Sequence, residues 1–547
     1  MKTLKKLAFV LAALMALSCF APMSAFATEN TFAFDETRIG YSAANVEKVD
    51  TSSFTDIKDL TALPAANTVA NYKITNAAGL VKLAELVNGN TEEDNNPFSG
   101  GTIYLANNIN MSDVANFTPI GHTATGDGND TPMLSIRVFC GTFDGQGFTI
   151  DNLTINGTTS CQKQAFGLFG VVKAATIQNV VLGKNCTITV SGTNSNTFVG
   201  GIIGVCWHTD PIVVKNCYSA ATVSGTTHVG GIVGNLHTVS PGYNVNIQYC
   251  TNAGTVTGTG RVGGVLGMLQ NYSGTLIKSC SNIGTIKQTS IGTDTGKSVG
   301  GICGANNNKW TNETTYTTTT FIKNVNYGKI EAKATPYAGG IIGCVRTCTL
   351  TDNKDYGVVT VAGVIQENTK VYGKPYDSDT SKITEEGTNA VLPNADRAMI
   401  HGYQIKANGD NAVDIRFVGS IDSTAYSAVG MDIIVTYTYK NDQNQDVTVV
   451  KKLGATDCTE VYTSLNAMYN GQDVSFSAET LREDGQGYLF AVVLQNVPKG
   501  VGNLTVNVTP YCKDMADTPE TYQGKPKTDI IDIEELPDST VSVYSGN

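Results

Sequence analysis

The sequence predicts an all-β protein: a parallel β-helix with an N-terminal capping helix, followed by a β-sandwich domain. Three observations lead to this fold class. A glycine signature recurs along the middle of the chain, a second short motif recurs between its copies, and the composition favours short strands joined by tight turns. Of the 547 residues, 57 are Gly and only 16% are charged, a mixture that suits strands and turns better than helices.

The glycine signature appears six times. Its first copy is Phe166–Gly170, and the later copies read Val-Gly-Gly-Ile-Ile-Gly or a close variant. Counted from Gly167, successive copies are 33, 30, 33, 37 and 39 residues apart. Repeats of this length are typical of solenoids. The five later copies begin at Val199, Val229, Val262, Val299 and Ala338.

A second motif lies between the glycine signatures. Its copies are Asn216–Val223, Tyr249–Val256, Ser279–Ile286 and Asn324–Ile330. Each repeat therefore contains several short strands, bounded by glycines where the chain turns. One such unit cannot bury an apolar face alone, but stacked units pair their backbones about 4.8 Å apart and share one core. A helical solenoid is excluded, since each interior Gly would cost about 1 kcal/mol.

Stacking in register places like residues on like. We expect one interior ladder formed by Val180, Cys217, Cys250, Cys280 and Val325. Because Cys exchanges with Val in this alignment, the position requires a small apolar group, which favours buried thiols. The alternative is disulfides, which export permits and which the even number of Cys left after the signal peptide allows.

The glycine signature resembles the GLUG motif of bacterial surface and secreted proteins. The similarity rests on Gly167–Gly170, which reads Gly-Leu-Phe-Gly, and on its Gly-Gly-Ile-Ile-Gly-type successors. Gly141–Ile150 resembles the segment that leads into such an array. The resemblance covers roughly residues 70–360 and implies a right-handed β-helix with a surface or adhesive role. It carries over no catalytic residue, because the motif is structural.

The N-terminus has the pattern of a secretory signal peptide. A basic start is followed by an apolar run to Phe20 and a small-residue exit at Ala25–Ala27. We therefore expect a secreted or cell-surface-associated protein with no transmembrane segment in the mature chain. The predicted parts are the signal peptide 1–27, an N-terminal extension 28–70, the β-helix and its cap 71–365, a linker 366–394, a β-sandwich 395–530 and a tail 531–547.

Both ends of the repeat array carry other elements. An open β-helix end exposes unpaired strand edges and needs a cap. Asn76 can begin a helix that ends at Gly89, and its apolar face consists of Leu80, Leu83, Ala84 and Val87. After the repeats, strand-like runs separated by turns predict the β-sandwich. These runs are 413–421, 431–439, 447–453, 488–496 and 504–511.

Charge is unevenly distributed. Residues 151–360 contain 14 Lys and Arg against 7 Asp and Glu, a local net of +7 within a chain of net charge −11. One interpretation is a dilute, solvated surface. The other is a mildly basic repeat body that faces an anionic partner such as an acidic glycan. We expect no nucleic-acid partner, and the oligomeric state stays open.

Aromatic side chains gather after each glycine signature, in segments of variable length. Because the repeats stack, these segments should emerge along one side as an aromatic strip, and flat rings beside polar groups suit sugar faces. The alternative is that the rings merely cover the flank. The predicted ligand-binding residues are Trp207, His208, Tyr243, Tyr272, Trp310 and Tyr316.

Catalytic and cofactor motifs are weak in this sequence. Gly258–Gly263 matches G-x-G-x-x-G, but a strand rather than a helix follows it, and the His residues lack metal-ligand spacing. We therefore predict no cofactor, no metal site and no catalytic residue. The preferred function is an adhesin-like protein that contacts glycans or extracellular matrix. A polysaccharide lyase or glycoside hydrolase is the main alternative, although only Asp352 and Asp355 among the solenoid acids are close in sequence. A structural spacer is the third possibility.

Overall fold

The computed structural model contains two compact units, residues 29–392 and a second unit centred on residues 393–547. Each is described by itself. The structure describes residues 40–43, 46–65, 67–90, 98–122, 137–159, 164–192, 197–207, 211–237, 245–270, 274–306, 319–366, 370–376, 380, 383–391, 398–408, 412–421, 428–440, 443–458, 461–462, 488–498, 503–513, 521–524, 526–532 and 542–545.

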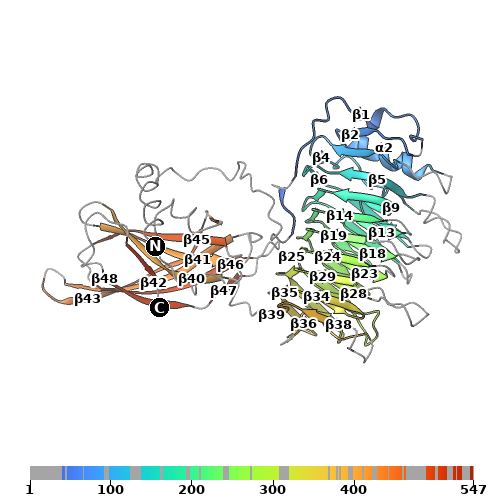
Figure 1. Cartoon of the computed structure of the whole chain (residues 1–547). Coiled ribbons are helices and arrows are strands. Elements are labelled where there is room, and N and C mark those ends of the chain that lie inside the picture. Colours follow the sequence, from blue (N-terminus) through green and yellow to red (C-terminus); the bar gives the residue numbers. More distant parts are fainter. Residues whose placement is uncertain are drawn as a thin grey trace, which may run out of the picture. The chain divides into compact units, whose positions relative to one another are not determined.

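The first unit is a parallel β-solenoid of about eight turns (Figure 1). Its coils stack into four sheets, which we call A, B, C and D. One complete coil runs from sheet D through two strands of sheet A to sheets B and C. That coil consists of β12 (Phe198–Gly200), β13 (Ile203–Trp207), β14 (Ile212–Lys215), β15 (Tyr218–Ser219) and β16 (Thr222–Ser224).

Sheet A begins as single strands and then divides into two columns. The single strands are β1 (Thr55–Asp56), β2 (Asn71–Ile74), β3 (Thr102–Leu105), β5 (Phe139–Asp144) and the long β9 (Phe169–Gln178). One column continues from β13 through β18 (Val233–His237), β23 (Leu266–Gln270), β28 (Cys303–Asn306) and β33 (Ile342–Cys344). The other continues from β14 through β19 (Val245–Gln248), β24 (Thr275–Lys278), β29 (Thr319–Ile322), β34 (Cys348–Thr351) and β38 (Ile383–Glu386).

The other three sheets are built from shorter strands. Sheet B consists of β4 (Ile109–Asn110), β6 (Thr149–Asp151), β10 (Val181–Leu182), β15, β20 (Thr251–Asn252), β25 (Ser281–Asn282), β30 (Val325–Asn326), β35 (Lys354–Asp355) and β39 (Ala390–Val391). Sheet C consists of β7 (Thr154–Thr158), β11 (Thr187–Ser191), β16, β21 (Val256–Gly258), β26 (Ile286–Ile291), β31 (Lys329–Ala334), β36 (Val358–Val361) and β37 (Val364–Ile365). Sheet D consists of β8 (Ala165–Phe166), β12, β17 (His228–Gly230), β22 (Arg261–Gly263), β27 (Ser298–Gly300) and β32 (Ala338–Gly339).

The glycine signatures stack on one another, as predicted. Gly200 pairs with Gly230, Gly230 with Gly263, and the column continues to Gly339. Steric crowding requires glycine at these positions. A Cβ at the first glycine, as in Gly230, would overlap a carbonyl oxygen of its own turn, and one at the second, as in Gly264, would overlap the carbonyl oxygen of Gly301. The signature therefore marks the tight turn between sheets D and A in every coil.

The interior is dry and continuous, and the predicted cysteine ladder lies inside it. Val180, Cys217, Cys250 and Cys280 are fully buried. Cys217, Cys250 and Cys280 are free thiols, which supports the thiol interpretation for the ladder.

The expected last member of that ladder was wrong. Ser281 pairs with Val325, so Asn324 rather than Val325 stands in register with Cys280. The thiols of Cys250 and Cys280 donate to carbonyl oxygens of the preceding coil, at 3.7 Å each. The amide of Asn324 donates to Ile277 O at 2.9 Å in the same way. From Cys217 onward the position therefore holds a side chain that donates to the preceding coil, whereas Val180 at the start of the ladder is purely apolar.

A second ladder, of asparagines, runs through sheet B. Asn252 donates from Nδ2 to Asn282 Oδ1, Asn282 to Asn326 Oδ1, and Asn326 to Asp355 Oδ1, each at 2.8 Å. These four side chains are at most 1% exposed. Each Nδ2 also donates to the carbonyl oxygen two residues further along its own coil, so the ladder pairs buried polar atoms both within and between successive coils.

The ends of the solenoid differ from the predicted boundaries. The helix α2 (Ala77–Asn88) begins with Asn76 as N-cap and buries the predicted apolar face. The solenoid starts earlier than residue 71, because β1 pairs in parallel with β2. It also ends later than residue 365, because β38 and β39 pair with β34 and β35. Much of the expected linker therefore belongs to a further coil.

Part of the expected N-terminal extension lies along the solenoid. Gly40 N donates to Ser279 O at 2.7 Å, and Ser42 N donates to Asn216 Oδ1 at 2.9 Å. The segment thus crosses several coils before the chain enters η2 (Ile57–Asp59) and the first strands. It appears in dark blue beside the coils in Figure 1.

The second unit consists of antiparallel strands, including all five that the sequence predicts. One sheet has the order β44 (Val461–Tyr462), β45 (Tyr488–Pro498), β41 (Ala412–Ile421), β40 (Ala398–Asn408) and β49 (Ser542–Ser545). The other has the order β43 (Asp446–Cys458), β42 (Ala428–Lys440), β46 (Asn503–Lys513) and β47 (Thr521–Gln523), with β48 (Lys527–Asp532) also paired to β46. Of the helices in the described part of the chain, none has the length and apolar character needed to cross a membrane.

Candidate binding surface

The structure describes one of the six residues expected to bind a ligand, Trp207 at the end of β13. The other five, His208, Tyr243, Tyr272, Trp310 and Tyr316, lie outside the described residues. The aromatic strip as a ligand site therefore stays a prediction.

The variable segments begin and end along lines on sheet A. Trp207 pairs with His237, and His237 with Gln270, at the points where three of the segments begin. Ile212 pairs with Val245 where two of them end. In the coil of β9 a single uninterrupted strand of 10 residues passes the same place. Each variable segment is thus an insertion between two strands that together occupy the place of the single strand β9. The residues at which the segments begin and end are aligned by the pairing between coils.

Trp207 packs on the outer side of sheets A and D. Its ring stacks on His237 with centroids 4.3 Å apart and planes 10° apart, and it clusters with Phe198 and Val205. The side chain is only 5% exposed. At this position the ring covers the flank of the solenoid.

His228 and Arg261, from two neighbouring coils of sheet D, lie together beside this cluster. His228 stacks on Phe198, and His228 Nε2 lies 3.1 Å from Arg261 Nη1. Burial, then the charge of Arg261 and that of His237, hold the pKa of His228 well below its ordinary value. His228 is therefore neutral and can accept a hydrogen bond from the guanidinium group.

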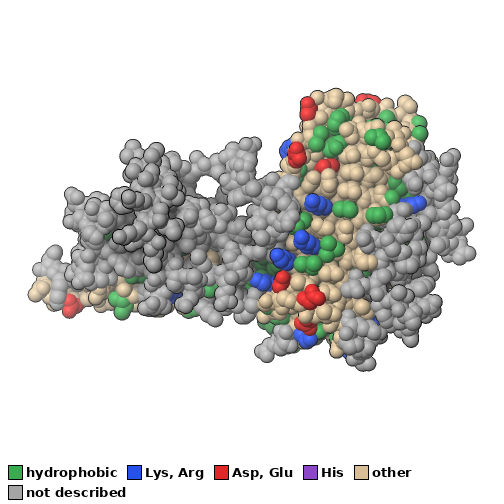
Figure 2. Space-filling view, viewed as in Figure 1, with side chains coloured by type: hydrophobic (Ala, Val, Ile, Leu, Met, Phe, Trp, Pro, Cys, Tyr) green, Lys and Arg blue, Asp and Glu red, His purple; other side chains and the backbone are tan. Residues whose placement is uncertain are grey.

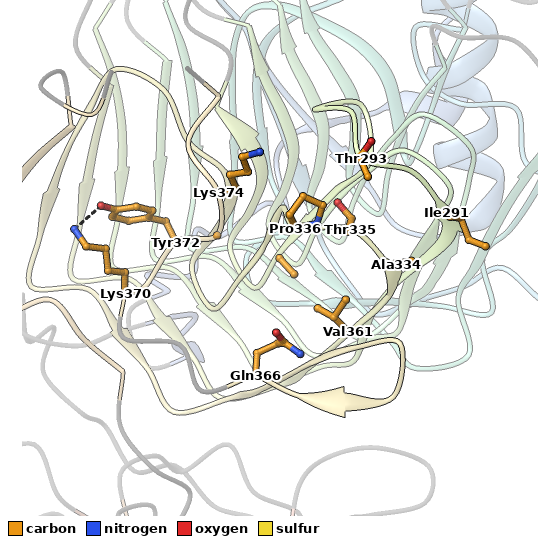
Figure 3. Close-up of a pocket in the computed structure, with 12 residues that line it drawn as sticks. Ile291, Thr293, Ala334, Thr335, Pro336, Val361, Gln366, Lys370, Tyr372 and Lys374 are labelled. Carbon is orange, nitrogen blue, oxygen red and sulfur yellow. Dashed lines mark hydrogen bonds between the residues drawn. The ribbon is translucent and has the colours of Figure 1, made fainter. Parts of the chain in front are cut away.

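An open depression of about 720 Å³ lies on the last coils (Figure 3). It is bounded by the ends of β26, β31 and β36 and by the segment after β37. In Figure 3, Tyr372 and Lys370 stand on one side and Ile291 and Thr293 on the other. The lining residues are Ile291, Thr293, Ala334, Thr335, Pro336, Ala338, Val361, Gln366, Lys370, Tyr372, Gly373 and Lys374.

Tyr372 is held in this depression by two charged groups. Its hydroxyl accepts from Lys370 Nζ at 2.7 Å and donates to Glu385 Oε1 at 3.1 Å, and Lys370 also pairs with Glu385 at 2.7 Å. Burial is the main cause that raises the pKa of Tyr372, so the phenol keeps its proton at neutral pH. The ring is fixed and its polar end is already paired, and with the residue only 7% exposed it contributes an edge to the wall of the depression.

A second depression of about 590 Å³ adjoins the first along the same three strands. On β31, Ala332 and Lys333 line the second depression and Ala334 lines the first; on β26, Thr289 lines the second and Ile291 the first. The residues lining the second depression are Lys287, Gln288, Thr289, Lys329, Glu331, Ala332, Lys333, Thr360, Ala362 and Gly363. The two depressions form one continuous surface, which we call the C-face groove.

The C-face groove is strongly basic. Its lining contains five lysines and one glutamate, a net of 5 − 1 = +4. The single acid, Glu331, lies 3.4 Å from Lys287 and 3.2 Å from Lys329. Figure 2 shows Lys and Arg side chains at intervals along the visible face of the coils. The groove shares this charge with the repeat body, since residues 151–360 carry +7 in a chain of net charge −11.

Sequence reasoning missed the C-face groove. Five of its lining residues lie in the segment interpreted as a linker: Gln366, Lys370, Tyr372, Gly373 and Lys374. Lys370, Tyr372 and Lys374 alternate with Val371 and Gly373, a period of two that predicts a strand and could have identified a further coil.

The carboxylates and metal ligands do not converge in the described residues. Asp355 is buried at the end of the asparagine ladder, whereas Asp352 lies at a turn and accepts from Thr388 N at 2.8 Å. These two acids therefore serve different structural roles. Within the same residues, no three His, Cys, Asp or Glu side chains are grouped so that they could hold a metal ion.

Comparisons with known proteins give no family. No protein-family model and no curated protein matches the chain. Two solved structures are similar to parts of it. One is a Bacteroides ovatus protein named as a candidate immunoglobulin A1 protease, with 17% identity and a TM-score of 0.41 over 59% of this chain and 86% of that one. The other is the enzymatically active domain of tailspike protein 4 of bacteriophage CBA120, with 8% identity and a TM-score of 0.17 over 83% of this chain and 66% of that one.

Proposed function

We propose that this chain is a secreted or cell-surface-associated, adhesin-like protein that binds glycans through the flank of its β-solenoid. The C-face groove supports this proposal best. It combines the edge of the fixed Tyr372 ring with an amide at Gln366 and a hydroxyl at Thr293. An apolar edge beside hydrogen-bonding groups is a combination that suits sugar rings.

The proposal includes three finer structural points. The coils wind in the right-handed sense that parallel strands favour, α2 covers the first coil, and the antiparallel sheets of the second unit pack as a sandwich. Secretion follows from the signal-peptide pattern at 1–27, and the GLUG-type signature supports a surface role. In this arrangement the solenoid presents the binding surface.

A glycan array of the mature protein tests the proposed function. Tyr372→Ala removes the ring and should abolish the signal, while Tyr356→Ala should retain it. Tyr356 is a matched control because it is also buried, stacks on Tyr327 and lies outside the groove. Gln366→Ala, at a partly exposed position, gives a second variant with little effect on folding.

The alternatives predict other results. A structural spacer binds no glycan on the array. A lyase releases unsaturated sugars and a hydrolase releases reducing ends, and either product would replace the binding proposal by an enzymatic one. The raised pKa of Tyr372 counts against its use as a general base at neutral pH.

A further inference from the structure

We infer that the ligand of the C-face groove is an acidic polysaccharide chain, which occupies both depressions at once. The inference rests on the proposed function, because it names the ligand class for the same groove. It depends on the charge and on the continuity of the lining, not on the tyrosine ring alone.

The groove lies in the basic part of an acidic chain. Residues 151–360 carry +7 and the rest of the chain −11 − 7 = −18, while the lining of the groove by itself carries +4. Such a distribution attracts anions to the repeat body. Neutral glycans need no such concentration of lysines.

The lysines have a regular arrangement on the surface. Lys329 and Lys333 are four residues apart on β31, and Glu331 between them stands in register with Lys287 on β26. A β-strand rises about 3.3 Å per residue, so Lys329 and Lys333 are separated by about 13 Å. Lys370 and Lys374 have the same spacing on the other side of the groove. A ligand that meets both pairs is a chain with repeated negative charges rather than one acidic sugar.

Two of these lysines are well placed to meet a ligand. Lys333 and Lys374 are exposed, and each lines a different depression. Lys374 Nζ lies 5.5 Å from the centre of the Tyr337 ring. The other three lysines form ion pairs with Glu331 and Glu385. They contribute mainly to the electrostatic potential of the groove, and they are Lys287, Lys329 and Lys370.

A saccharide fits this surface better than a nucleic acid, the other common polyanion. A nucleic-acid site of this size usually presents several aromatic platforms for successive bases. Among the residues that line the groove, Tyr372 is the single aromatic side chain.

The test measures binding of the mature, full-length protein to acidic polymers and to the same polymers without their charge. The pairs are polygalacturonate with its methyl ester, and chondroitin sulfate with its desulfated, carboxyl-reduced form. We expect binding of at least one acidic polymer, at least about tenfold weaker binding of its neutral partner, and loss of affinity as salt is raised. Lys333→Glu/Lys374→Glu should weaken acidic binding by about tenfold or more.

A matched control separates the groove from net charge. Lys173→Glu/Lys184→Glu changes the charge of the chain by the same amount at two positions outside the groove and should leave the affinity within about twofold. Circular dichroism of both double variants checks that the fold is intact.

The remaining outcomes divide the two proposals. Equal binding of the neutral polymers, abolished by Tyr372→Ala, would keep the glycan function and overturn the acidic ligand. Binding of no acidic polymer would overturn the inference, and an empty glycan array would overturn the proposed function with it. Binding of single-stranded DNA as tightly as any polysaccharide would also overturn the saccharide class.

Discussion

Asn326 donates a hydrogen bond from Nδ2 to Asp355 Oδ1 at 2.8 Å. This bond ends a ladder of buried amides with a carboxylate, directly beneath the second glycine of the last signature, where a Cβ at Gly340 would overlap the Asp355 side chain. The glycines of the column therefore pack against the side chains of the asparagine ladder. Most of the following predictions test how the coils are held together.

Asn282→Ala should lower stability markedly. It removes the bonds to Asn252 and Asn326, each of which keeps one other partner, Gly254 O and Gly328 N. A lost hydrogen bond costs about 0.5–1.5 kcal/mol, and the missing side chain also leaves a cavity. The measurement is the midpoint of denaturant unfolding. Asn156→Ala, at an exposed position, is the control. Equal midpoints for the two variants would contradict a stabilising role of the ladder.

Gly264→Ala should be far more damaging than Gly363→Ala. The new Cβ at 264 would overlap Gly301 O and approach Asn282 Oδ1 to 2.6 Å, whereas at 363 it would meet nothing within 4 Å. Gly363 has φ +79, so its variant shows the backbone penalty alone, about 1–2 kcal/mol. Thermal unfolding of both variants checks the prediction. Similar losses would contradict the steric requirement for glycine in the column.

Lys323→Asn should stabilise the protein. Lys323 has φ 52, as part of a column of left-handed residues that includes Asn179 and Asn216. This conformation costs most residues about 1–2 kcal/mol, and Asn tolerates it better. We expect a gain of about 0.5–1 kcal/mol, seen as a higher unfolding midpoint. Lys184→Asn, at an exposed site, should give no gain, and a gain there would point to charge instead.

Stability should fall as the pH drops below about 6.5. Burial keeps the pKa of His228 well below its ordinary value in the folded state, so below pH 6.5 the unfolded chain binds a proton that the folded chain does not. The unfolded state is therefore favoured increasingly as pH falls toward the folded pKa. Tm measured between pH 7.5 and 5 should decrease, and less so in His228→Gln. Parallel curves for the two proteins would exclude His228 as a cause.

The ladder thiols should resist alkylation in the native protein. Cys217, Cys250 and Cys280 are fully buried, and burial raises the pKa of the first two well above its ordinary value; the thiolate is the reactive form. Mass spectrometry after iodoacetamide treatment should show these residues unlabelled, and labelled once the protein is unfolded. Cys186, with a pKa raised to about 11, should behave alike. Native labelling of the ladder would indicate that the coils open.

The sequence by itself determined the solenoid, the glycine column and the nature of its buried thiols. These depend on local patterns that repeat: a glycine is needed wherever the same turn occurs, and an apolar residue wherever a strand faces the interior. Stacking then multiplies one local requirement along the chain. The strands of the second unit, such as Met431–Tyr439, were predictable for the same reason, since they have a period of two.

Only the tertiary structure decided which residues meet. The pairing of Ser281 with Val325 placed Asn324 in the cysteine ladder, because unequal segments between motifs hide the register. The C-face groove joins Ile291, Ala334 and Tyr372, which come from separate coils. Their proximity follows from backbone pairing between coils, a long-range contact that no local pattern in the sequence encodes.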